Sequence, residues 1–130
     1  MMVSILVVDD QPQLLESIRM TLELAGYLVR TARTGIEALT VLQAQLIDLI
    51  LTDIEMPQLD GYQLCRRVRA DGRWSTIPLL FLSAYGDEED MRYAKALGAD
   101  DYLVKPIEPE GLLAAVHDCL QLRSNRSRQP

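Results

Sequence analysis

Residues 5–10, Ile-Leu-Val-Val-Asp-Asp, decide the fold, because they join a continuous apolar run to two carboxylates. A strand that is covered on both faces has this uninterrupted apolar pattern, which is typical of parallel sheets. Pro12 suits the first turn of a helix, and Asp10 is placed to cap that helix. The stretch therefore predicts a buried strand followed directly by a helix.

The same order of strand and helix recurs along the rest of the chain. Short apolar runs predict further strands at residues 27–31, 49–52, 77–82 and 102–104. Apolar side chains at helical spacing predict the helices between and after them. These side chains are Leu14, Leu15, Ile18 and Leu22, then Leu39, Leu42 and Leu46, then Leu64, Cys65 and Val68, and finally Leu112, Leu113, Val116 and Leu120. Five strand-helix units in a row imply a parallel sheet with helices on both faces.

Local signals mark where several of these helices begin and end. Thr34 and Glu37 have the spacing of a capping box ahead of the second helix. The acidic residues 87–90 place negative charge at the start of the fourth helix, which the helix dipole favours. Gly26 and Gly98 are natural helix stops. The third helix is expected to end near Asp71.

The composition excludes several classes of protein. The chain has 130 residues, 48% of them apolar and 25% charged, with a formal net charge of −6. An acidic domain repels the phosphate backbone, so we expect no nucleic-acid binding by this domain alone. No apolar run approaches the roughly 18–20 residues of a membrane span, and the start has no basic region of a signal peptide. A cytoplasmic location is the expectation.

The chain is expected to hold one domain over residues 1–122. The remaining residues, 123–130, read Arg-Ser-Asn-Arg-Ser-Arg-Gln-Pro and predict a disordered tail or the start of a linker. Cys65 and Cys119 belong to no metal or redox motif, so we expect buried, reduced thiols.

Polar residues stand at the carboxyl ends of the predicted strands, where folds of this type place their active sites. They are Asp9 and Asp10, then Asp53, Ser83 and Lys105. Three carboxylates that meet at one edge repel one another unless positive charge offsets them. The Lys105 ammonium and a bound divalent cation such as Mg²⁺ can do so. A carboxylate in such a site can attack phosphorus and form an aspartyl phosphate.

These strand-end residues resemble those of the response regulator receiver family, over residues from about 3 to 121. The match rests on Asp9-Asp10, Asp53, Met56-Pro57 with Gly61, Ser83-Ala84 and Lys105-Pro106, in this order. The resemblance implies a single doubly wound α/β domain with a flavodoxin-like parallel sheet. Its five strands should have the order 2-1-3-4-5, with five helices around them.

The resemblance also implies a role for each acidic residue. Asp53 is expected to be the phosphoacceptor. Asp9, Asp10 and Asp53 are expected to hold Mg²⁺, together with the backbone carbonyl of Glu55.

Three further residues take their roles from the same resemblance. Ser83 is expected to move to the phosphoryl group and Lys105 to bind it. Tyr102 is expected to be the aromatic switch residue, and the Lys105–Pro106 peptide bond to be cis.

The implied function is two-component signalling rather than enzymatic turnover. A sensor histidine kinase or phosphotransfer protein would donate a phosphoryl group from a phosphohistidine to Asp53. The fourth helix, fifth strand and fifth helix, about residues 88–121, would then change to control an output or a homodimer. No membrane partner is expected.

Three alternatives come from other classes. A haloacid-dehalogenase-like hydrolase needs a DxD motif after its first strand, and Asp9-Asp10 lacks that spacing. A flavin-binding electron carrier needs a Ser/Thr/Gly-rich phosphate loop, and these two carboxylates would repel a phosphate there. The remaining alternative is a degenerate receiver that acts only as a protein-interaction module.

Overall fold

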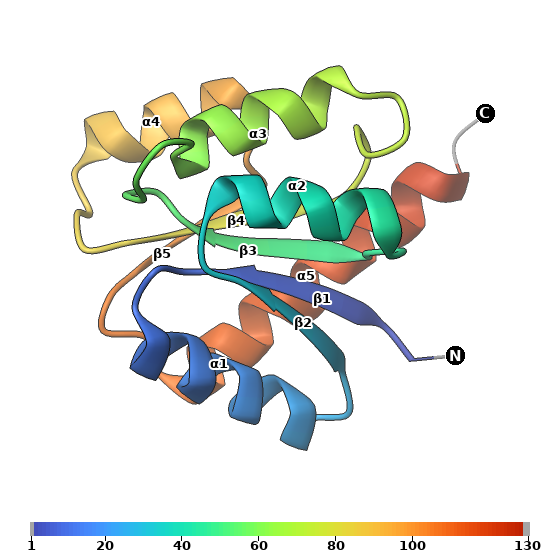
Figure 1. The fold of residues 1–130 in the computed structure, drawn as a ribbon, viewed down its shortest axis with the longest axis horizontal. Coiled ribbons are helices and arrows are strands. Elements are labelled where there is room, and N and C mark those ends of the chain that lie inside the picture. Colours follow the sequence, from blue (N-terminus) through green and yellow to red (C-terminus); the bar gives the residue numbers. More distant parts are fainter. Residues whose placement is uncertain (1, 129–130) are drawn as a thin grey trace.

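The computed structural model describes residues 2–128, which form alternating strands and helices (Figure 1). Met1 and residues 129–130 of the predicted tail lie outside the described residues. The strands are β1 (Ser4–Val8), β2 (Leu28–Ala32), β3 (Leu49–Asp53), β4 (Leu79–Ser83) and β5 (Asp101–Val104). The helices are α1 (Pro12–Leu24), α2 (Gly35–Ala44), α3 (Gly61–Ala70), α4 (Glu88–Leu97) and α5 (Pro109–Arg128).

All strand pairs are parallel, and the sheet has the order β2-β1-β3-β4-β5. This order confirms the predicted fold. Every residue of β1, β3 and β4 is buried, whereas the edge strands β2 and β5 are largely exposed. The continuous apolar runs thus belong to the three central strands, which are covered on both faces.

Two hydrophobic layers lie on opposite faces of the sheet. Side chains of α2, α3 and α4 pack on one face, with Phe81 of β4 at its centre. Side chains of α1 and α5 pack on the other face against β1, β3 and β4. Figure 1 shows α2, α3 and α4 above the sheet and α1 below it, with α5 running diagonally behind the strands.

The predicted helix stripes are largely confirmed. Leu15, Ile18 and Leu22 of α1 are buried, as are Leu64, Cys65 and Val68 of α3. Leu112 and Val116 of α5 are buried as well. Both cysteines are free and buried, as expected. Trp74 is buried in the layer that holds α3.

The prediction is wrong for one residue of the apolar stripe of α2, Leu46. The helix ends at Ala44, and the following Gln45 has an extended backbone. Leu46 therefore leaves the helical repeat and is 94% exposed. The predicted cap of α1 is wrong too, because Gln11 is the N-cap residue and makes no side-chain capping bond. Asp10 instead lies beside the other carboxylates described below.

The predicted disorder after residue 122 is also wrong for the described part of the tail, because α5 continues to Arg128. Extending an existing helix costs little, since nucleation is the expensive step. Arg123 also lies against the body of the domain, with its Nε 3.9 Å from Oδ1 of Asp48. None of the described helices combines the length and the apolar character that crossing a bilayer requires.

Candidate functional site

The strand order brings the polar strand ends to one edge of the sheet. Asp9 and Asp10 follow β1, Asp53 ends the neighbouring β3, and Ser83 ends β4. Lys105 follows β5, and its backbone N–H donates to the carbonyl of Ser83 at 2.8 Å. Since parallel strands end on the same side, these residues meet as the sequence predicted.

The centre of the site is an acidic cluster with one ammonium. Carboxylate oxygens of Asp9, Asp10 and Asp53 all lie within 4.8 Å of one another. Asp9 is fully buried and Asp53 is 6% exposed. The Nζ of Lys105 lies 3.2 Å from Oδ2 of Asp9 and 3.3 Å from Oδ1 of Asp53. The second oxygen of Asp9 accepts the backbone N–H of Gln11 at 2.8 Å, which fixes its orientation.

The environment of Asp53 makes its carboxyl group unusually basic. Burial, and then the nearby Asp9 carboxylate, raise its pKa from 3.8 to about 6, against the opposing effect of Lys105. A single ammonium does not neutralise three carboxylates. The donor set therefore fits a hard divalent cation, which binds carboxylate and carbonyl oxygens and keeps several waters.

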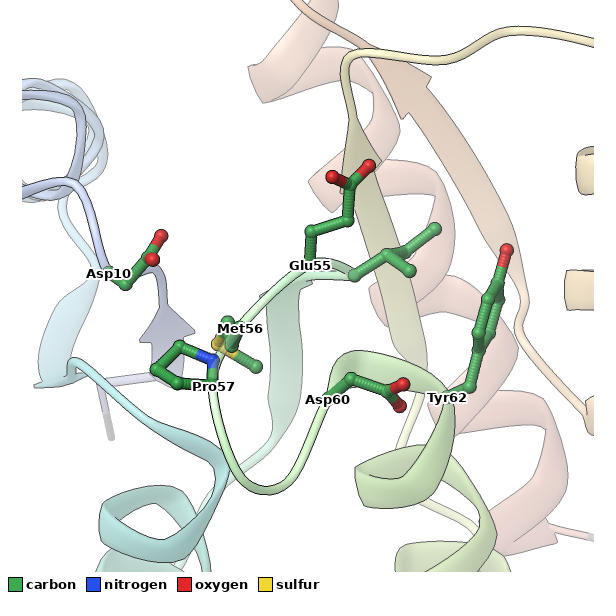
Figure 2. Close-up of a pocket in the computed structure, with 7 residues that line it drawn as sticks. Asp10, Glu55, Met56, Pro57, Asp60 and Tyr62 are labelled. Carbon is green, nitrogen blue, oxygen red and sulfur yellow. The ribbon is translucent and has the colours of Figure 1, made fainter.

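The loop from β3 to α3 lines a pocket that Asp10, one member of this cluster, also lines. Figure 2 shows Asp10 at one end of this pocket and Tyr62 at the other, with Glu55, Met56 and Pro57 between them. Glu55 is exposed, and its backbone follows the buried Ile54, which comes directly after β3. This places its carbonyl in the loop that borders the acidic cluster.

Two close contacts fix the conformation of this loop. A Cβ on Gly61 would lie 2.4 Å from the carbonyl oxygen of Asp53, so only glycine fits there. The N–H of Gly61 donates to the carbonyl of Ile54 at 2.8 Å. Asp60 and Gln63 then form a reciprocal capping box at the start of α3. The sequence analysis missed this capping box, although its spacing, with an acidic residue three before a glutamine, is a recognised signal.

On the β4 side, Ser83 is buried, with 2% of its surface exposed. Its hydroxyl accepts a hydrogen bond from the backbone N–H of Tyr85 at 3.1 Å. The hydroxyl of Tyr102 donates to the carbonyl of Tyr85 at 2.5 Å. Burial raises the pKa of Tyr102, and a hydrogen bond with Ser83 partly offsets this. The two predicted switch residues therefore both contact Tyr85, in the loop that follows β4. The Lys105–Pro106 peptide bond is cis.

The comparisons with known proteins agree on one family. The family model described as the response regulator receiver domain matches residues 5–117. The DNA-binding dual master transcriptional regulator RpaA of Synechocystis sp. is 39% identical over 125 residues, which cover 96% of this chain and 52% of that protein. The chain spans about half the length of RpaA and of several other curated relatives, whose names describe them as probable transcriptional regulators.

Solved structures give the same result. A putative response regulator from Chloroflexus aurantiacus has a TM-score of 0.89 and 39% identity, over 93% of this chain and 99% of that one. The chemotaxis protein CheY4 of Vibrio cholerae has a TM-score of 0.88 and 35% identity, over 92% and 99% of the two chains.

Proposed function

The chain belongs to the response regulator receiver family, and we propose that it accepts a phosphoryl group on Asp53 and signals by a conformational change. The donor is a phosphohistidine of a sensor histidine kinase or of a phosphotransfer protein. The observation that carries this proposal is the Lys105 ammonium, held between Asp9 and Asp53 at 3.2 and 3.3 Å in a buried acidic cluster.

Asp53 is the nucleophile in this proposal. One of its carboxylate oxygens attacks phosphorus, a new P–O bond forms, and the P–N bond to the donor imidazole breaks. The imidazole keeps the bonding electron pair and takes a proton from solvent. A pKa of about 6 leaves Asp53 ionised at neutral pH, yet more basic than an ordinary aspartate, which supports its role as the attacking group.

Lys105 and Ser83 stabilise the transferred group. The ammonium can leave Asp9 and bind a phosphoryl oxygen, and the buried Ser83 hydroxyl can donate to another. Asp9, Asp10, Asp53 and the backbone carbonyl of Glu55 would hold Mg²⁺. When bound, this ion offsets the negative charge on the phosphoryl oxygens during transfer.

The signal leaves the site through β4. Ser83 must approach Asp53 to donate to the phosphoryl group, and the loop with Tyr85, which Ser83 and Tyr102 both contact, must follow. The face formed by α4, β5 and α5 then controls partner binding or a homodimer. The chain acts as a signalling domain in the cytoplasm, and its net charge of −6 supports the absence of direct nucleic-acid binding.

The test is to treat the protein with acetyl phosphate and Mg²⁺ and to locate the adduct by mass spectrometry. We expect one phosphoryl group, on Asp53, and a strong decrease when Mg²⁺ is omitted or Asp10 is replaced by alanine. Asp118→Asn, which changes an exposed carboxylate of α5, is the matched control. Modification of Asp53→Asn to the wild-type extent would refute the assignment, and a wild type that stays unmodified would favour the degenerate receiver.

A further inference from the structure

Helix α4 is held in place by few side chains. Of its residues, all of which the structure describes, Ala94 alone is buried. Its N-cap residue Asp87 makes no side-chain capping bond. The position of α4 must therefore depend on a small number of contacts, and these can be identified individually.

The carboxyl end of α4 is tied to α3. The Nε of Arg69 donates to the carbonyl of Gly98 at 2.9 Å, and its Nη2 donates to Asp100 at the same distance. The thiol of Cys65 lies 3.7 Å from the carbonyl of Leu97. The end of α4 that lies far from Ser83 is thus fixed, while the end that follows the Ser83 loop has no comparable anchor among the described contacts.

The middle of α4 rests on a series of aromatic rings. Tyr93 meets Tyr62 of α3 edge-to-face, with ring centroids 4.9 Å apart and an interplanar angle of 85°. Tyr62 in turn meets Phe81 of β4 at 5.4 Å and 81°. The guanidinium of Arg66 donates to the Tyr93 hydroxyl, and its Cζ lies 6.0 Å from the centre of that ring.

Tyr62 is the central ring of this series and is joined to the site on two sides. It follows Gly61, which is packed against the Asp53 carbonyl, and it lines the pocket that contains Asp10 (Figure 2). Its other neighbour, Phe81, precedes Ser83 by two positions in β4, so both side chains point to the same face of the sheet.

We propose that Tyr62 is a positioning residue that couples the pocket lined by Asp10, beside the acidic cluster, to α4 through its ring contacts with Phe81 and Tyr93. This inference rests on the proposed function and adds a second connection to the one between Ser83 and Tyr102. When β4 and its loop respond to a phosphoryl group, the unanchored end of α4 moves about its fixed carboxyl end. Tyr93 must then move against Tyr62, so the Tyr62 ring determines how α4 follows the site.

The test uses amide NMR spectra with and without beryllofluoride, a phosphoryl mimic, in the presence of Mg²⁺. In wild type we expect shifts both in the loops around Asp53 and along residues 88–97. In Tyr62→Leu the shifts around Asp53 remain, while those of α4 fall about threefold, as expected when a mutation between two sites weakens their coupling. Tyr93→Ala, which removes the same contact from an exposed position, has the same effect.

Two controls separate coupling from a general structural effect. Tyr62→Phe keeps both ring contacts and should restore the wild-type response. Arg67→Ala changes an exposed neighbour on α3 and should respond as wild type does. An α4 response in Tyr62→Leu equal to that of wild type would overturn the inference, and so would an equal loss in Tyr62→Phe. Wild-type spectra without shifts around Asp53 would instead contradict the proposed function itself.

Discussion

Helices α3 and α4 have the same length of 10 residues and lie side by side on the same face of the sheet (Figure 1), but they are held very differently. Helix α3 begins with a reciprocal capping box, and it buries Gly61, Leu64, Cys65 and Val68. Helix α4 lacks a side-chain capping bond and buries Ala94 only. Each helix follows a strand that ends in the site, β3 for α3 and β4 for α4.

Under the proposed function, this difference separates the part of the domain that would hold the chemistry from the part that would respond to it. The buried stripe of α3 holds the loop that follows Asp53, which supports a fixed geometry for the proposed phosphoacceptor. Few buried contacts oppose a movement of α4, and elements of low local stability are those that move in conformational switches. Under the proposed function, we expect a packed core on one side and a weakly held helix on the other to allow the two discrete arrangements of a switch.

The largest expected effect is on stability. Leu64→Ala should lower the free energy of unfolding by about 2–5 kcal/mol, because it leaves a cavity in a fully buried layer. Met91→Ala, on the exposed side of α4, should change it by less than about 1 kcal/mol. Urea denaturation followed by circular dichroism measures both values. Equal losses in the two variants would contradict the comparison between the helices.

The next effect concerns the buried carboxyl group of Asp53. The pKa of Asp53 is raised to about 6 from 3.8, mainly by burial, so the folded state binds this proton more tightly than the unfolded state does. Its contribution to stability is therefore fully present below pH 3.8 and is lost as the pH rises through about 6.

Asp53→Asn should then raise the free energy of unfolding at pH 7, without Mg²⁺, by about 1–3 kcal/mol. The gain should shrink steadily as the pH is lowered toward 4, and urea titrations at several pH values would follow it. Asp118→Asn should show no such dependence, because its side chain is 82% exposed. A variant less stable than wild type at pH 7 would mean that the attraction of Lys105 outweighs burial.

A smaller effect is expected from the loop that leads into α4. Under the proposed function, water would hydrolyse the aspartyl phosphate, and the resemblance to receiver domains implies that Glu55 and Tyr85 lie beside its path. Tyr85 is 58% exposed, and its ring should hinder that water. Tyr85→Ala should speed dephosphorylation about threefold by opening the path to water. Decay of the phosphorylated protein, with Met91→Ala as the control, measures the rate, and an unchanged rate would exclude steric hindrance by Tyr85.

The sequence was most informative where the pattern is strictly local. Continuous apolar runs located β1, β3 and β4, and the residue that follows or ends each strand supplied Asp9, Asp53 and Ser83. The parallel order then brought these side chains together, because strand ends of one direction share an edge.

The failures have different physical reasons. The end of α2 before Leu46 follows from the extended backbone of Gln45, whereas the end of α5 past residue 122 has a distant contact between Arg123 and Asp48. Tyr62 gave no periodic signal, because its ring meets Phe81 and Tyr93, which are far from it in sequence. Such contacts appear only when the chain is folded.

The most direct test of the difference between α3 and α4 compares amide hydrogen exchange of the wild-type protein with and without beryllofluoride, in the presence of Mg²⁺. We predict changes in the loops around Asp53 and across residues 88–121, the face that contains α4, β5 and α5. The peptides of α3, residues 64–70, should exchange at the same rate in both states. Changes confined to the loops around Asp53, or changes in α3 as large as those in α4, would contradict the account.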